Sequence, residues 1–205
     1  MSFRDMLVRA AGASGVPLQP RVVDACAAHF ALLVRWNRTH NLTRITDPEE
    51  AAKRHYLDCL LPLLAWEAPR SFVDVGAGAG FPGLLAALVW PTAKATLVEP
   101  AAKRVSFLRL AATAMAVDVE IEPPGNARGD RVLSRATFPP GAREQLAPYA
   151  GHEIAVWGHA DDLDTWKDEV ATWGQRWSGT CRPYALPGFA GRMLLLACDH
   201  PLSST

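Results

Sequence analysis

A glycine-spaced turn that follows an apolar run is the feature that most constrains how this chain can fold. Residues 72–75 read Phe-Val-Asp-Val, which is typical of a buried strand. Glycine then recurs at alternate positions, as Gly76, Gly78 and Gly80, and lets the backbone turn sharply and pass close to a ligand. Glu99 ends the next apolar run, where a carboxylate can accept hydrogen bonds from both hydroxyls of a ribose. Together they predict a nucleoside-binding site at the edge of a parallel sheet.

The residues that close the turn distinguish between nucleoside cofactors. Pro82 opens the next helix, and proline lacks one of the backbone amides with which a helix N-terminus attracts a diphosphate. The turn therefore favours S-adenosylmethionine over a dinucleotide, and with it a transferase over an oxidoreductase. No lysine-serine pair of a P-loop follows the glycines, which argues against ATP. A tight turn that binds nothing is the structural alternative.

Composition narrows the class of protein. Of 205 residues, 49% are hydrophobic, which is enough for a sizeable core, and no apolar run approaches the length of a membrane span. The first residues lack the apolar segment of a signal peptide. The four cysteines are scattered without a C-x-x-C pair. We therefore expect a cytoplasmic monomer with reduced thiols, no metal site and no membrane partner.

The N-terminal part of the chain differs in pattern from the rest. Residues 1–70 show helical spacing at about 19–38 and a helix start at Asp47, followed by proline and two glutamates, that should lead into a helix ending near Leu64. Residues 1–46 hold six arginines against two aspartates, although the whole chain has no net charge. This basic segment is either a surface for an anionic partner or a solvated helix face.

From residue 71 strands alternate with helices, which predicts a parallel sheet covered by helices on both faces. The expected strands are 71–76, 94–99, 117–122, 131–136, 153–157, 177–186 and 191–198, and the expected helices are 82–89, 101–115, 141–149 and 161–173. The last two strands, joined by a short loop, should form an antiparallel hairpin. The predicted fold is α/β and Rossmann-like, with a mostly parallel seven-stranded sheet in a domain of residues 71–205 and a helical extension of residues 1–70.

At this level of detail the chain resembles the GidB/RsmG family of bacterial methyltransferases, which modify N7 of a guanine in 16S ribosomal RNA. The resemblance extends in order over nearly the whole chain. It is carried by Trp36-Asn37 with Asn41-Leu42-Thr43, by Arg54-His55-Tyr56-Leu57-Asp58, by the loop Asp74–Gly83, by Lys103–Leu108, by Ser134-Arg135-Ala136, and by Leu186-Pro187-Gly188 with Gly191–Leu194. The proline and the last glycine of the loop are more distinctive than its G-x-G spacing.

The resemblance implies a class I methyltransferase fold that binds S-adenosylmethionine and acts on ribosomal RNA or the small ribosomal subunit. It implies a cofactor site made of Asp74, Gly76, Gly78, Gly80, Phe81, Glu99, Ala127, Arg128 and Arg135. It implies an RNA-binding surface that contains Arg38, Asn41, Arg44, Lys53, Arg54, His55, Lys103 and Arg104. Arg135 would be the catalytic residue and would hold the methionine carboxylate or guanine O6 through its planar guanidinium.

Three of these residues also have a structural interpretation. Arg135 could tie its strand to the following loop. His55 is interpreted as a buried histidine bonded to Asp58 or to the backbone rather than as a general base. Trp36 shares the apolar face of its helix and is interpreted as a core residue rather than a platform for RNA bases.

The chain departs from the family pattern at three places. Glu99 and Pro100 stand where the family has Asp-Ser, which keeps the carboxylate. Arg128 stands where an acidic residue is expected near the adenine, and Trp157 stands where the family has a lysine that would face the RNA. Two alternatives therefore accompany the main interpretation: a methyltransferase of this fold that acts on another RNA or a small molecule, and a non-enzymatic scaffold that binds S-adenosylmethionine.

Overall fold

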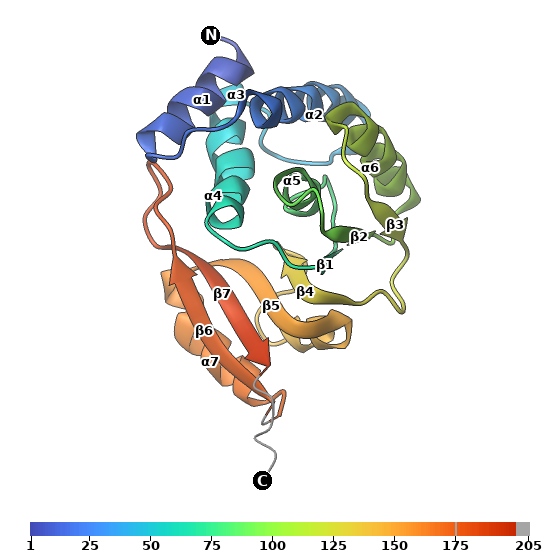
Figure 1. Cartoon of the computed structure of the whole chain (residues 1–205), viewed down its shortest axis with the longest axis vertical. Coiled ribbons are helices and arrows are strands. Elements are labelled where there is room, and N and C mark those ends of the chain that lie inside the picture. Colours follow the sequence, from blue (N-terminus) through green and yellow to red (C-terminus); the bar gives the residue numbers. More distant parts are fainter. Residues whose placement is uncertain (175, 200–205) are drawn as a thin grey trace.

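A seven-stranded sheet with the strand order β3-β2-β1-β4-β5-β7-β6 forms the centre of the structure (Figure 1). The structure is a computed structural model that describes residues 1–174 and 176–199, so residues 175 and 200–205 of the predicted domain lie outside the described residues. The strands are β1 (Ser71–Val75), β2 (Lys94–Val98), β3 (Glu120–Glu122), β4 (Gly129–Ser134), β5 (Ala150–His159), β6 (Trp177–Pro183) and β7 (Arg192–Asp199).

The sheet has the predicted mixed architecture. Strands β1 to β5 pair in parallel, whereas β7 pairs antiparallel with both β5 and β6. The chain leaves β1 for β2 on one side and later returns to β4 on the other, so the strand order reverses at β1. Ligands of open α/β sheets bind outside the carboxyl ends of the strands at such a reversal. The glycine turn after β1 lies at this point.

Helices precede the sheet and connect its strands. They are α1 (Phe3–Ala13), α2 (Pro20–His40), α3 (Pro48–Ala51), the π-helix η1 (Ala52–Leu57), α4 (Asp58–Leu64), α5 (Gly83–Val89), α6 (Ala102–Met115), the 3-10 helices η2 (Arg143–Tyr149) and η3 (Ala160–Asp162), and α7 (Leu163–Ala171). Helix α1 was not among the expected helices, although a capping box between Ser2 and Asp5 starts it. None of the helices in the described ranges 1–174 and 176–199 combines the length and apolar character that crossing a membrane requires.

The helix predicted from Asp47 to Leu64 forms, but its middle is not a regular α-helix. Asp47 caps the start as expected, with its side chain accepting the backbone N–H of Glu50 at 2.8 Å. Residues 52–57 then widen into a π-helix, a form that is often found at functional sites. This turn carries Lys53, Arg54 and His55, three of the residues predicted to face RNA.

Other differences from the predicted elements lie at strand ends. β3 is only three residues long, and β6 ends at Pro183 because the following residues form the connection to β7. β4 begins and ends two residues before its predicted bounds, so Arg135 stands in the loop just beyond the strand. Ala136 follows in the left-handed backbone region with a φ of 57°, which a regular strand does not permit.

The helices before residue 70 and the sheet share one hydrophobic core. On one face of the sheet, Leu33 of α2, Tyr56 of η1 and Phe107 of α6 belong to the same buried cluster as Phe72 of β1. On the other face, Trp166 of α7 packs with the strand residues that point the opposite way. Figure 1 shows α2, α4, α5 and α6 on one side of the sheet and α7 beside β6 on the other. The N-terminal helices therefore bear directly on the edge of the sheet where the glycine turn lies.

The close approach of α5 to β1 yields a first prediction. A methyl group at Gly83 would lie 2.3 Å from Leu97 Cδ2 and 2.4 Å from Asp74 Oδ2, so these buried side chains or helix α5 would have to shift. We expect Gly83→Ala to lower the free energy of unfolding by about 1–3 kcal/mol, as overpacked cores do. Gly12→Ala is the matched control, because Gly12 lies in α1 with open space around its Cα and should gain about 0.5–1 kcal/mol. Urea denaturation measures both, and equal effects would contradict the packing argument.

Candidate active site

The glycine turn is held by the end of the neighbouring strand β2. Gly76, Gly78 and Gly80 all have positive φ values, 78°, 56° and 88°, which explains the three glycines. The N–H of Gly76 donates to the carbonyl of Val98 at 2.9 Å, and the N–H of Gly78 donates to Glu99 Oε2 at 2.9 Å. Glu99 is 2% exposed. The structure therefore brings the predicted glycines and the predicted carboxylate together at the carboxyl edge of the sheet.

Asp74 lies beneath this turn with one free oxygen. Its Oδ2 accepts the N–H of Gly83 at 2.8 Å, whereas its Oδ1 is buried and has no hydrogen-bond partner among the described residues. Burial raises the pKa of Asp74 to about 7, and the bond from Gly83 opposes this rise only in part. A buried oxygen that lacks a hydrogen-bond partner is suited to bind a donor or a cation supplied by a ligand. Asp74 thus fits its predicted place in the cofactor site, where it could accept from the methionine amine.

The predicted cofactor fits the geometry of the turn. A methyl group at Gly78 would meet only the carbonyl oxygen of Gly76, at 3.7 Å, so open space adjoins the backbone there. The Glu99 carboxylate has bonds from Gly78 and Ala101 and keeps further lone pairs for ribose hydroxyls. Together with Asp74, these groups could hold S-adenosylmethionine.

A histidine of α2, which sequence reasoning missed, holds the turn from the other side. Nε2 of His29 lies 2.9 Å from the carbonyl oxygen of Ala79, and Nδ1 lies 2.6 Å from the hydroxyl of Tyr56. Burial lowers the pKa of His29 to about 4, so the ring is neutral and carries one N–H. Because a carbonyl can only accept, Nε2 donates to Ala79 and Nδ1 accepts from Tyr56. No local pattern marks His29, which stands on the apolar face of its helix.

His55 of the π-helix is buried as predicted, but its partners differ from those expected. Nε2 lies 2.7 Å from Thr43 Oγ1, and Nδ1 lies 3.4 Å from Arg135 Nη1. The expected bond to Asp58 or to the backbone is therefore wrong; the π-helix directs the ring toward Thr43 and Arg135 instead. Burial, followed by the charge of Arg135, lowers the pKa of His55 to about 3. Its neutral ring also stacks on Phe81, with centroids 4.8 Å apart.

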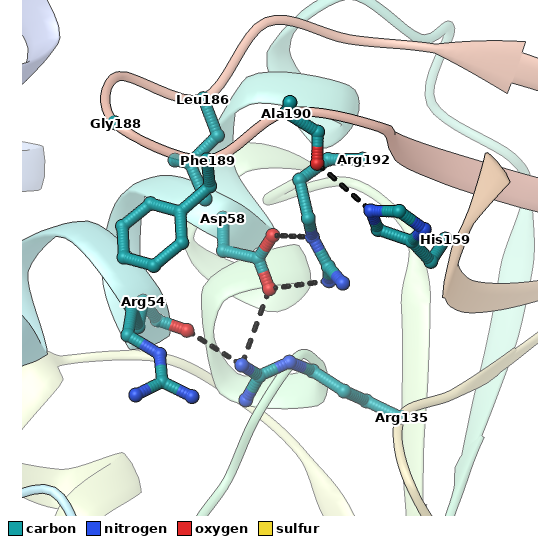
Figure 2. A pocket seen from close by; sticks show the side chains of 9 residues that line it. All are labelled: Arg54, Asp58, Arg135, His159, Leu186, Gly188, Phe189, Ala190 and Arg192. Atoms are coloured by element: carbon teal, nitrogen blue, oxygen red, sulfur yellow. Dashed lines mark hydrogen bonds and ion pairs between the residues drawn. The ribbon is translucent and has the colours of Figure 1, made fainter. Parts of the chain in front are cut away.

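The carboxylate of Asp58 organises the side of the site that lies beyond β4 (Figure 2). Its Oδ1 accepts from Arg192 Nε at 2.8 Å and from the hydroxyl of Tyr184 at 2.7 Å. Its Oδ2 accepts from Arg192 Nη2 at 2.9 Å and from Arg135 Nη2 at 3.2 Å. Arg135 also donates to the carbonyl of Arg54. The predicted catalytic arginine is thus held in place by a buried carboxylate, a role that the sequence analysis did not give to Asp58.

The remaining residues predicted to bind RNA surround this edge of the protein. Arg38, Asn41, Arg44, Lys103 and Arg104 are exposed. Helices α2 and α6, which carry three of them, pack against each other (Figure 1). Lys53 and Arg54 form ion pairs with the glutamates one turn earlier in their helix, Glu49 and Glu50.

Other predicted residues show which interpretation their surroundings favour. Ala127 is buried and Arg128 is exposed in the loop after β3. Trp36 packs against the core, as the structural interpretation predicted. Trp157, at the position of the family's lysine, points inward and donates from Nε1 to the carbonyl of Asp58 at 2.9 Å. The lost lysine is therefore replaced by a core residue that supports Asp58.

Comparison of sequences connects this site to known proteins. The family described as "GidB: rRNA small subunit methyltransferase G" matches residues 24–137. Ribosomal RNA small subunit methyltransferase G from Roseiflexus sp. (strain RS-1) is 44% identical over 106 residues, which cover 51% of this chain and 45% of that protein. The protein of the same name from Xanthomonas axonopodis pv. citri (strain 306) is 33% identical over 198 residues, which cover 87% of this chain and 90% of that protein. The chain therefore spans about half of the length of the Roseiflexus protein.

Comparison of structures supports the fold. The S-adenosylmethionine-dependent methyltransferase SibL superposes with a TM-score of 0.61 and 11% identity, covering 97% of this chain and 74% of that chain. Cofactor-bound Rv0187 from MTB superposes with a TM-score of 0.54 and 18% identity, covering 89% and 90%. The predicted class I methyltransferase fold is thereby confirmed.

The raised pKa of Asp74 yields a second prediction, about pH. Asp74 keeps its proton up to about pH 7 in the folded protein, whereas an unfolded chain releases it near pH 3.8. The folded state binds more protons between these values, so the stability that Asp74 contributes falls as the pH rises through this window. We therefore compare the free energy of unfolding of ligand-free Asp74→Asn protein with that of the wild type. We expect the variant's value, relative to the wild type, to rise by on the order of 2 kcal/mol from pH 5 to pH 8.

Urea unfolding at both pH values measures this difference. His29 and His55 are present in both proteins, so their own pH dependence cancels in the comparison. Asp118→Asn, at an exposed position before β3, is the control and should show the same difference at either pH. A pH-independent effect of Asp74→Asn would contradict the raised pKa.

Proposed function

We propose that this chain, which belongs to the GidB family of small-subunit rRNA methyltransferases, transfers the methyl group of S-adenosylmethionine to N7 of a guanine in 16S ribosomal RNA. The observation that carries the proposal is the buried Glu99 carboxylate bonded to the glycine turn at the point where the strand order reverses. We propose a cytoplasmic protein that acts as a monomer on ribosomal RNA or the small subunit; Asp74, Glu99 and Arg135 of one chain meet at one edge of its sheet.

The chemistry that the site has to perform is mainly alignment. Bound S-adenosylmethionine would supply an already activated methyl group. Guanine N7 has an in-plane lone pair and needs no general base. The two histidines beside the turn fit this chemistry, because His29 and His55 are neutral and each uses both ring nitrogens within the protein. Orientation of the reacting groups can then provide several kcal/mol of the barrier, on the order of 7 or more in favourable systems.

Arg135 is the residue that we propose to face the acceptor. Its guanidinium stands at the carboxyl end of β4, 3.4 Å from His55, which stacks on Phe81 after the glycine turn, and Asp58 and the Arg54 carbonyl fix two of its N–H groups. A fixed planar donor can hold a carboxylate or guanine O6 with little loss of side-chain entropy on binding. Glu99, Gly78 and Asp74 would hold the cofactor. The exposed basic side chains of Arg38, Lys103 and Arg104 would contact RNA phosphates.

Mass spectrometry of ribosomal RNA tests this function. We expect 7-methylguanine to disappear from 16S RNA in a strain that lacks the gene and to return with the wild-type gene. With purified protein, we expect Arg135→Lys to lower kcat by about 100-fold, because lysine cannot reproduce the planar donor. Arg70→Lys is the control, since Arg70 is exposed before β1 at the opposite edge of the sheet and should leave kcat unchanged. Unchanged 7-methylguanine in the deletion strain would overturn the proposal.

The His29 contact predicts a separate effect on cofactor affinity. Tyr56→Phe removes the hydroxyl that donates to Nδ1 of His29. The proton can then sit on either ring nitrogen, and only the Nε2–H form donates to the carbonyl of Ala79. We expect the Kd for S-adenosylmethionine to rise about fivefold to tenfold, which corresponds to a hydrogen bond of roughly 1 kcal/mol. Tyr149→Phe, directly before β5 at the amino edge of the sheet, should leave the Kd unchanged. Calorimetry with both variants measures this, and equal Kd values would argue against the positioning role.

A further inference from the structure

The function described so far assigns no ligand to a pocket that Arg135 helps to line. Its volume is about 390 Å³, within the range of small-molecule sites, and six of its lining residues are Arg54, Asp58, Arg135, His159, Phe189 and Arg192. In Figure 2, Arg135 and Arg192 converge on Asp58, while the Phe189 ring lies on the side of Arg54.

The pocket lies at the same edge of the sheet as the glycine turn but is separate from it. Arg135 follows β4, His159 ends β5, and Arg192 begins the antiparallel strand β7, so all three stand at the carboxyl edge of the parallel strands. None of residues 76–81 lines the pocket. His55 lies between the two regions, stacked on Phe81 and 3.4 Å from Arg135. A ligand here would lie beside Arg135, the residue that the proposed function places at the guanine.

The charge of the pocket favours a phosphate. Three guanidinium groups line it; Asp58, whose two oxygens already accept four hydrogen bonds, is the one carboxylate among the lining residues, and Glu50 outside the lining pairs with Arg54, so one positive charge is left in excess. Each guanidinium carries five N–H donors, and the bonds found in the described part of the chain use only some of them. Arginine forks match the geometry of phosphate oxygens. Excess positive charge and open donors therefore meet in one pocket.

An aromatic platform stands at the rim of the same pocket. The Phe189 side chain is 37% exposed, and Arg54 Cζ lies 5.7 Å from its ring centroid. Two contacts fix the loop that carries Phe189. The backbone N–H of Phe189 donates to the carbonyl of Leu186 at 2.9 Å, and His159 Nε2 lies 2.9 Å from the carbonyl oxygen of Ala190. Unstacked RNA bases bind on such aromatic rings. A free phosphate ion would make no use of this ring.

We propose that this pocket binds the RNA nucleotide that flanks the methylated guanine, with its phosphate on Arg54, Arg135 and Arg192 and its base on Phe189. The inference rests on the proposed function and adds to it a subsite for the strand that presents the guanine. The inference also gives a role to the contact between His159 at the end of β5 and Ala190 in the connection from β6 to β7, which holds Phe189 in place.

Binding of a hexauridylate RNA to the full chain tests the subsite without methyl transfer. The probe lacks guanine, and saturating S-adenosylmethionine fills the cofactor site. We expect Phe189→Ala to raise the Kd of hexauridylate about tenfold, in the range found for loss of one stacked base, and to leave the Kd of inorganic phosphate unchanged. Phe189→Trp should restore the affinity for hexauridylate. Fluorescence anisotropy measures the RNA and calorimetry measures phosphate.

The arginine part of the pocket has its own variant and control. We expect Arg54→Gln to weaken both ligands and to lower the salt dependence of RNA binding by about one counterion. Arg70→Gln, at the opposite edge of the sheet, should change neither. Wild-type affinity of Phe189→Ala for hexauridylate, equal losses in the two arginine variants, or phosphate binding as tight as RNA binding would each overturn the subsite.

The two proposals fail in different ways. If 16S RNA carries its 7-methylguanine but Phe189→Ala leaves the KM for RNA unchanged, the subsite falls and the proposed function stands. If the binding changes appear as expected but 16S RNA is not the acceptor, the proposed function falls and the RNA subsite stands.

Discussion

The four hydrogen bonds to the buried carboxylate of Asp58 are the interaction on which the part of the site around Arg135 depends. They join α4 to the loop after β4 through Arg135, to the end of β6 through Tyr184, and to the start of β7 through Arg192. Trp157 of β5 joins this strand to the same group of residues, because its side chain donates to the backbone carbonyl of Asp58. A buried charge whose partners are removed costs several kcal/mol, about 3–5 in measured cases, so this arrangement forms as a unit.

The glycine turn is constrained in a complementary way, from two opposite sides. Glu99 and Val98 hold it from the sheet, while His29 holds it from the N-terminal helices. Because these helices share a core with β1 and α6, the turn has little freedom to open. The N-terminal segment therefore shapes the cofactor side of the site in addition to carrying exposed basic groups that we propose to contact RNA.

The parts of this structure that could be predicted are those that a local pattern specifies. The apolar run of β1, the glycine turn and the cap at Asp47 each follow from a few neighbouring residues, and all three form as expected. The capping box of α1, between Ser2 and Asp5, is also a local signal, although α1 was not among the expected helices. The π-helical turn at residues 52–57 has no such signal. The contacts of His29 with Ala79 and of Asp58 with Arg192 could not be foreseen, because they join residues 50 and 134 positions apart.

The most direct test of this account is transfer of labelled methyl groups to 16S RNA by the wild type and by Asp58→Asn protein, measured beside the Kd for S-adenosylmethionine. The account predicts that the wild type methylates guanine N7. It also predicts that Asp58→Asn binds the cofactor with nearly unchanged affinity, which shows that it is folded, but transfers methyl groups far more slowly because Arg135 is no longer fixed. Transfer by Asp58→Asn at the wild-type rate would contradict the central role given to this carboxylate.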